Sequence, residues 1–241
     1  MGFDLHGLIK FFNKLEDYVW RKDIIPVKAS TLADFFWCSR RSYIKFILEN
    51  TPASIAKSLD VNFDEITRED KESAKVGSLL HGGSYGFYVT VLPIPPKERV
   101  YKLAKDGRVI PRNLKTDVGM FQIQGAVDEI RPEDEGYIIR ELKTTRKESI
   151  SRYALAPAEF QVQIYGWILS GYLPVKRLEL VFINQNTRKV IYKTIVIFDE
   201  KDVKNKIVEV LNMYRHKQLK PPKQWKCSKC SLRSLCEECL S

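Results

Sequence analysis

Residues 121–143 limit the fold of this chain more than any other stretch; they read FQIQGAVDEIRPEDEGYIIRELK. Two alternating apolar runs flank a polar turn, and that pattern predicts a β-hairpin. Asp128 ends the first arm. In the second arm Ile139, Glu141 and Lys143 share one face, because strand side chains alternate with a period of two. A carboxylate and an ammonium therefore lie side by side on an otherwise apolar strand, where burial is costly unless they pair or hold a metal. The hairpin alone is equally consistent with a surface ion pair.

The remaining pattern predicts an α/β fold with one mixed central sheet flanked by helices. Apolar residues at helical spacing predict helices over 4–20, 31–48, 68–91, 155–171 and 200–219. Further strands are predicted over 178–184 and 189–197, and either short strands or an insertion over 99–103 and 108–114. With 241 residues, 44% of them hydrophobic, we expect a single domain over residues 1–241.

The chain is basic, with 40 Lys and Arg against 30 Asp and Glu, a net charge of +10. These residues are spread along the sequence, so we expect a folded basic surface that suits a polyanionic partner. No apolar run approaches the roughly 20 residues that a membrane span needs. The first 20 residues also lack the features of a secretory signal. We therefore expect a cytoplasmic protein with no membrane partner.

Five cysteines indicate a metal site rather than a disulfide framework. Four of them crowd into the last part of the chain, and their total is odd; the five are Cys38, Cys227, Cys230, Cys236 and Cys239. In a reducing compartment such crowded cysteines more often bind a metal than pair as disulfides. The four tail cysteines alone supply a zinc knuckle, which leaves Cys38 as a small buried side chain in the middle of its helix.

Four short motifs occur in a fixed order, each weak alone but specific together: Gly77-x3-His81, Gly125-x2-Asp128, Glu141-x-Lys143 and Gln161-x3-Tyr165. In this order they resemble the RecB-like nucleases of the PD-(D/E)xK superfamily. With the cysteines added, the chain resembles the CRISPR-associated Cas-four exonuclease family over residues 30–240. It departs from that family at Ser39, where proline is common, in the glycines that follow His81, and in the surplus Cys239.

The resemblance implies a RecB-like, restriction-endonuclease-type core that uses Mn²⁺ or Mg²⁺. His81, Asp128, Glu141 and the backbone carbonyl of Leu142 would hold the ion. Lys143 would orient or deprotonate the attacking water, or neutralise charge on the phosphate.

The helix that follows, and the cysteines, complete the expected site. Gln161 and Tyr165 would lie at the edge of the site, where they steady the acid-bearing strand or touch the DNA backbone. One [4Fe–4S] cluster would join residues 30–48 to residues 221–241 through its cysteine ligands, which are Cys38, Cys227, Cys230 and Cys236.

The implied activity is metal-dependent hydrolysis of single-stranded DNA from the 5′ end, in the processing of CRISPR prespacers. The expected partners are single-stranded DNA and CRISPR integrase proteins, and the sequence allows a homo-oligomer. One alternative is a free-standing DNA-repair exonuclease of the same superfamily. Another is a non-catalytic nucleic-acid-binding protein with a zinc knuckle, for which Asp128, Glu141 and Lys143 would be a coincidence.

Overall fold

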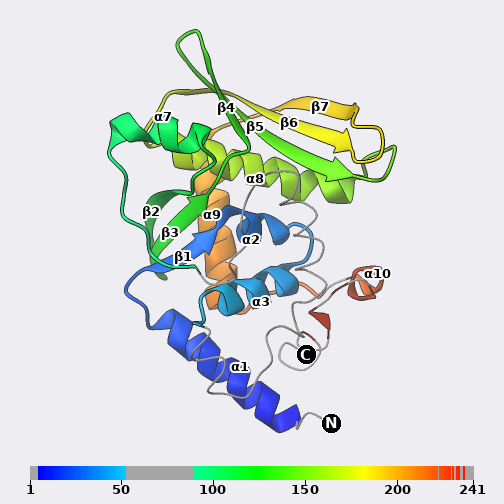
Figure 1. Ribbon diagram of the computed structural model, residues 1–241. Helices are drawn as coiled ribbons and strands as arrows, with labels where there is room; N and C mark the ends of the chain where they lie inside the picture. Colours follow the sequence, from blue (N-terminus) through cyan, green and yellow to red (C-terminus); the bar gives the residue numbers. More distant parts are fainter. Residues whose placement is uncertain are drawn as a thin grey trace.

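The computed structural model describes residues 5–52, 89–221, 223–228, 230, 232–233 and 236, and these form a mixed α/β fold (Figure 1). The elements in chain order are α1 Leu5–Trp20, β1 Ile25–Lys28, α2 Ala29–Asp34, α3 Ser39–Glu49, α7 Lys97–Lys105, β2 Ile110–Thr116, β3 Gly119–Gly125, β4 Glu129–Glu133, β5 Gly136–Thr145, α8 Arg152–Ser170, β6 Val175–Asn184, β7 Val190–Val196, α9 Glu200–Arg215 and α10 Gln224–Cys227.

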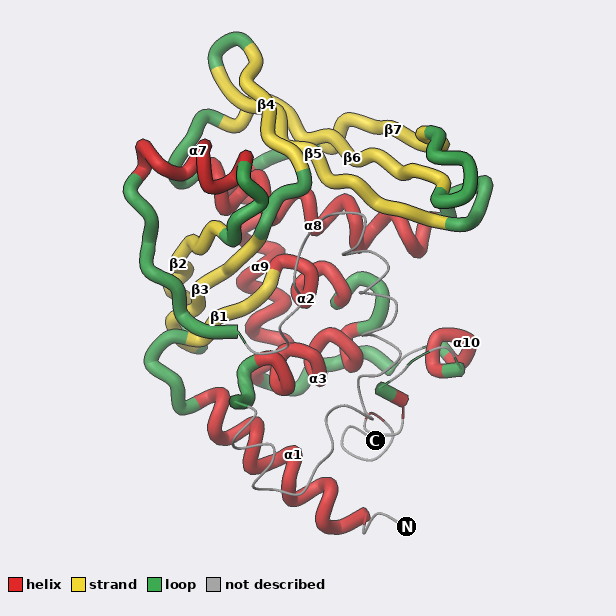
Figure 2. The backbone as a smooth tube through the Cα atoms, in the orientation of Figure 1, coloured by secondary structure: helices red, strands yellow, loops and turns green. Residues whose placement is uncertain are grey.

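Two sheets share one central helix. The first has the order β1-β3-β2, with β1 parallel and β2 antiparallel to β3. The second has the order β4-β5-β6-β7, in which only β5 and β6 are parallel. A parallel pair needs a crossover, and α8 provides it. Figure 2 shows α8 beneath the four-stranded sheet, and α8 also contacts β2 and β3.

The core lies where α8 packs between the second sheet and α9. Apolar side chains meet there from all three layers, among them Ile164, Trp167, Leu178, Leu180, Ile207 and Leu211. The predicted helices over 4–20, 155–171 and 200–219 are confirmed as α1, α8 and α9. The strands predicted over 178–184 and 189–197 are confirmed as β6 and β7.

The predicted hairpin is only half right. Its turn and second arm form the β4–β5 hairpin, in which Ile130 pairs with Ile139. Its first arm is β3, which belongs to the other sheet and pairs with β1 and β2. The chain leaves β3 at Gly125 and starts β4 at Glu129, so Asp128 lies in the connection between the sheets. The prediction of one central sheet is therefore wrong for the described residues, which form two.

One helix prediction needs correction, and the open prediction over residues 99–103 is settled as a helix. The helix predicted over 31–48 is divided into α2 and α3, and Cys38 is the extended N-cap of α3 rather than a mid-helix residue. Residues 99–103 belong to α7, not to a strand. Glu98 lies in the first turn of α7 and Lys102 and Lys105 in its last, an arrangement that the helix dipole favours. Residues 108–114, left open as a strand or an insertion, contain most of β2, and the predicted helix at 68–91 lies almost entirely outside the described residues.

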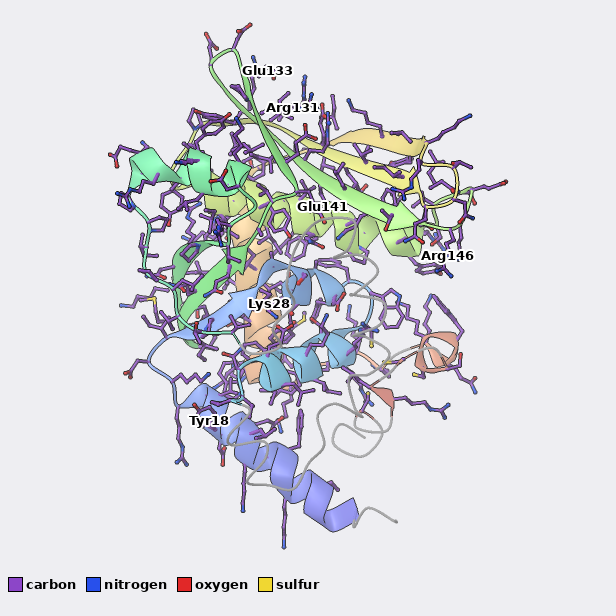
Figure 3. All side chains as sticks on the ribbon, viewed as in Figure 1. Tyr18, Lys28, Arg131, Glu133, Glu141 and Arg146 are labelled. Carbon is purple, nitrogen blue, oxygen red and sulfur yellow. The ribbon has the colours of Figure 1, made fainter. Side chains whose placement is uncertain are left out.

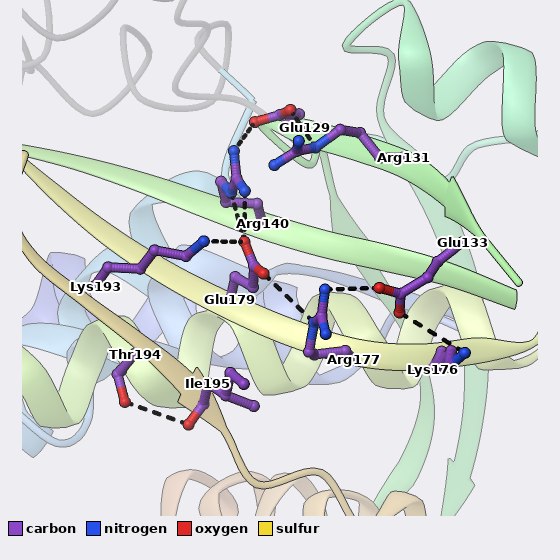
Figure 4. Close-up of polar contacts among 10 residues, drawn as sticks. All are labelled: Glu129, Arg131, Glu133, Arg140, Lys176, Arg177, Glu179, Lys193, Thr194 and Ile195. Atoms are coloured by element: carbon purple, nitrogen blue, oxygen red, sulfur yellow. Dashed lines mark hydrogen bonds and ion pairs between the residues drawn. The ribbon is translucent and has the colours of Figure 1, made fainter.

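The outer face of the second sheet carries a network of ion pairs (Figure 4). Glu179 on β6 is at its centre, with a side chain 5% exposed. It lies 2.5 Å from Arg140, 3.4 Å from Arg177 and 3.4 Å from Lys193. Glu129 lies 2.8 Å from the same Arg140. The charges on this face thus pair with one another, and Glu141 and Lys143 project from the opposite face.

Candidate active site

Glu141 lies on β5 between the second sheet and the helices beneath it (Figure 3). Its side chain is 3% exposed. Burial raises the pKa of Glu141 to about 8; the nearby Asp128 carboxylate acts in the same direction and Lys143 opposes it. Its Oε2 atom is buried and accepts no hydrogen bond from the described residues. An unsatisfied buried oxygen is costly, so a cation at this point would relieve that cost.

Lys143 follows two residues later on the same face. Its Nζ lies 2.6 Å from Oε1 of Glu141 and donates a hydrogen bond of 2.8 Å to Oε1 of Gln161. Burial disfavours the charged amine, but the adjacent Glu141 outweighs it and raises the pKa of Lys143. The ammonium is therefore held charged, at a fixed place beside the acid.

Gln161 and Tyr165 connect this strand to the helix that covers it. They are one turn apart on α8, and Nε2 of Gln161 donates to the hydroxyl of Tyr165 at 2.7 Å. The ring of Tyr165 occupies the space beside Gly125, where an added Cβ would lie 2.5 Å from its Cε1 atom. The glycine of one motif and the tyrosine of another therefore fit together, and Lys143 joins them through Gln161.

Asp128 is placed differently from the prediction. It is exposed, not inward-facing on a strand, because the chain crosses between the sheets at this point. Its Oδ2 accepts a 2.7 Å hydrogen bond from the backbone N–H of Leu142. This hydrogen bond satisfies the Leu142 N–H in place of a hydrogen bond to a neighbouring strand. Since the N–H and C=O of one strand residue point to the same edge, the Leu142 carbonyl also faces the side of Asp128.

The residues present fit a divalent cation. The carboxylates of Asp128 and Glu141, the latter with an unsatisfied buried oxygen, and the Leu142 carbonyl form a set of hard oxygen donors, which suits Mg²⁺ or Mn²⁺. Within the described part of the chain, no group of three or more His, Cys, Asp and Glu side chains is arranged to hold a metal. The third predicted side-chain ligand, His81, lies outside the described residues.

Asp34 is a neighbour of this site that the sequence did not reveal. It ends α2, and its Oδ2 lies 2.7 Å from Nζ of Lys45 and 3.7 Å from Nε of Arg41. Burial works against its charge, but Lys45, Arg41 and the more distant Lys143 together lower the pKa of Asp34. One continuous helix over 31–48 would separate Asp34 from Lys45 by about 16 Å. The break after Asp34 brings them together, so helical periodicity could not have found the pair.

The structure also draws distant cysteines together. Cys38 and Cys236 are buried, whereas Cys227 and Cys230 are partly exposed. Burial raises the pKa of Cys236 to about 11; Arg40 opposes this, and the nearby Cys38 and Cys230 add to it. A thiol from the α2–α3 junction thus interacts with thiols of the tail. Cys239 lies outside the described residues.

Comparison with known families decides the assignment. A model of the PD-(D/E)XK nuclease superfamily matches residues 39–237, which include Asp128, Glu141, Lys143 and the Gln161–Tyr165 pair. The chain belongs to the PD-(D/E)XK nuclease superfamily. Nucleases of this superfamily are generally metal-dependent and typically use Mg²⁺ or Mn²⁺.

Solved structures agree on the fold of this nuclease-superfamily chain. One of them, described as "Crystal structure of SSO0001", has 22% sequence identity and a TM-score of 0.56. The match covers 100% of this chain and 98% of that one. A search of curated proteins finds no match. None of the described helices is both long enough and apolar enough to cross a membrane.

Proposed function

We propose that this protein is a metal-dependent exonuclease that hydrolyses single-stranded DNA from the 5′ end and acts in CRISPR adaptation. The observation that supports it best is the buried Glu141, with one oxygen paired to Lys143 and the other unsatisfied. The net charge of +10 suits an anionic polymer. The choice of single strands, the 5′ direction and the CRISPR setting rest on the resemblance to the Cas-four family.

In this proposal His81, Asp128, Glu141 and the Leu142 carbonyl hold Mg²⁺ or Mn²⁺. The ion, when bound, polarises the phosphate and lowers the pKa of a water. Lys143, kept charged and 2.6 Å from Glu141, orients the attacking water or stabilises negative charge that develops on the phosphate oxygens.

The supporting residues of the proposed site lie on α8. Gln161 fixes the position of Lys143 through its side-chain oxygen, and Tyr165 in turn fixes Gln161. This arrangement sets the ammonium where the reaction needs it, and accurate positioning accounts for a large part of catalysis in general. We also propose that the whole chain acts as one nuclease domain, with residues 30–48 and 221–241 forming a cluster-binding region.

For that region we propose one [4Fe–4S] cluster bound by Cys38, Cys227, Cys230 and Cys236. The proximity of Cys38, Cys230 and Cys236 supports this ligand set over a zinc knuckle confined to the tail. The cluster has a structural role in this proposal, because it joins Cys38 to the tail across a long stretch of the sequence.

The experiment uses single-stranded DNA labelled at one end or the other, with Mn²⁺ or with chelator. The wild-type protein should shorten the strand from the 5′ end only when Mn²⁺ is present. Glu141→Ala and Lys143→Ala should lower the rate at least 100-fold, while Lys206→Ala, a surface lysine on α9, should not change it. Full activity in either site variant, or in chelator, would reject the proposal.

A further inference from the structure

Aromatic and basic side chains gather where the tail meets the start of α8. Nζ of Lys226 lies 5.3 Å from the ring centre of Trp37, 5.6 Å from that of Tyr153 and 5.7 Å from that of Trp225. It also donates a hydrogen bond to the backbone carbonyl of Trp37. Lys226 is only 8% exposed, so this cation is held among three rings that belong to three separate segments.

The outer side of this cluster remains open. Trp225 is 44% exposed and packs edge-on against Tyr153, with ring centres 5.4 Å apart. Lys223 and Arg152 are exposed and lie 5.3 Å and 5.4 Å from the Tyr153 ring. No carboxylate among the described residues forms an ion pair with Arg152, Lys223 or Lys226. Among the described residues, this cluster therefore differs from the outer face of β6, where the cations pair with acids.

This cluster is close to the candidate active site. Tyr153 and Gln161 are eight residues apart on α8, about 12 Å along its axis. Phe36 precedes Trp37 in the sequence; it is 44% exposed, and its ring centre lies 4.7 Å from that of Phe160, the neighbour of Gln161. Two exposed rings, Trp225 and Phe36, and the half-buried rings of Trp37 and Tyr153 therefore lie on the side of the molecule where α8 carries Gln161.

We propose that this surface binds single-stranded DNA and directs it to Glu141 and Lys143. We call it the aromatic–basic platform; it consists of Phe36, Trp37, Tyr153, Trp225, Arg152, Lys223 and Lys226. Unpaired bases stack on exposed rings regardless of sequence, and cations beside the rings meet the phosphates. A duplex keeps its bases stacked inside and cannot use the rings in this way. The inference rests on the proposed nuclease function and adds a place for its substrate. The platform also gives the tail a role, since Lys226 lies among the three rings and holds Trp225 in position.

Binding is measured with a fluorescent oligothymidine and the full-length protein carrying Glu141→Gln, which prevents cleavage. Adding Trp225→Ala should weaken binding about tenfold, whereas Trp225→Tyr should keep most of it. Lys223→Glu leaves the rings intact and should weaken binding and reduce its dependence on salt. Ile197→Ala, at a residue 86% exposed on the connection after β7, is the matched control and should change nothing. Affinity for a duplex of equal length should fall less than twofold in Trp225→Ala, because a duplex does not stack its bases on the rings.

Cleavage then separates this inference from the nuclease function itself. With Mn²⁺, Trp225→Ala and Lys223→Glu should cut single-stranded DNA more slowly but hydrolyse bis(p-nitrophenyl) phosphate, which is too small to reach the platform, at the wild-type rate. Equal binding and cutting of single strands by wild type and both variants would overturn the platform and leave the nuclease intact. Tight binding through Trp225 without any metal-dependent cleavage would uphold the platform and reject the nuclease.

Discussion

Gly125 shows how closely two motifs depend on each other. A methyl group at this position would lie 2.5 Å from the ring of Tyr165, which itself holds Gln161. Gly125→Ala should therefore destabilise the protein by about 1–3 kcal/mol and slow cleavage, because the clash displaces the Tyr165–Gln161–Lys143 chain. Urea unfolding and cleavage assays measure the two effects.

The double variant Gly125→Ala with Tyr165→Leu supplies the control for that prediction. The smaller side chain should restore stability but not activity, since the hydroxyl that fixes Gln161 is gone. If Gly125→Ala were as stable and as active as wild type, the close packing of these motifs would be refuted.

The raised pKa of Glu141 predicts how the stability of the metal-free protein depends on pH. Between about pH 4.3, its ordinary value, and about pH 8, the folded protein holds a proton that the unfolded chain has released. Stability should thus be highest in acid and fall as pH rises through about 8, by on the order of 1–3 kcal/mol.

Urea unfolding in chelator from pH 5 to pH 8 measures this effect. Glu141→Gln, which cannot ionise, should show a flatter pH profile than wild type. Parallel profiles for the two proteins would show that Glu141 is not a buried, proton-holding acid.

Among the secondary-structure elements, β5 carries Glu141 and Lys143 on one face, and on the other face β5 and β6 share an ion-pair network. Glu179→Gln leaves Arg140, Arg177 and Lys193 without their shared partner and should cost about 1–3 kcal/mol. Because Glu179 faces away from Glu141, the cleavage rate of the folded variant should be unchanged.

Chemical denaturation measures the stability of Glu179→Gln, and a cleavage assay measures its rate. Glu133→Gln, at the more exposed end of the network, should cost less than about 1 kcal/mol and serves as the comparison. Loss of cleavage in folded Glu179→Gln would mean that the two faces of the sheet are not independent.

The sequence predicted the elements with a clear period and missed the breaks between them. The helix α8 and the strands β6 and β7 have strong apolar patterns, so tertiary packing agrees with local preference. The alternation over residues 121–130, in contrast, runs through Asp128 without a gap. The change of sheet after Gly125 depends on the close approach of Tyr165, which lies 40 residues away in sequence.

The candidate site, like the fold, could be predicted only in part from the sequence. The family resemblance grouped Glu141, Lys143, Gln161 and Tyr165, and in the structure hydrogen bonds and an ion pair connect their side chains. Asp34 and Lys45 could not be found, since only the break between α2 and α3 brings them together. The exposure of Asp128 was missed for a similar reason: local alternation cannot show where a chain crosses between sheets.

For the molecule as a whole, the proposed cluster would join Cys38 to three cysteines of the tail. With a cluster on Cys38 and three tail cysteines, anaerobically purified protein should be brown, and Cys38→Ser should be pale and less stable to heat. Cys239→Ser should stay brown. A colourless protein that contains one zinc, unaffected by Cys38→Ser but emptied by Cys239→Ser, would replace the cluster with a zinc knuckle.

The most direct test of a metal-dependent nuclease centre is a Mn²⁺ titration of the full-length protein, followed by electron paramagnetic resonance. Wild type should bind the ion at a site that Glu141→Gln and Asp128→Asn each weaken at least tenfold, while Glu179→Gln binds like wild type. Equal Mn²⁺ binding by wild type and Glu141→Gln would contradict the assignment of this centre.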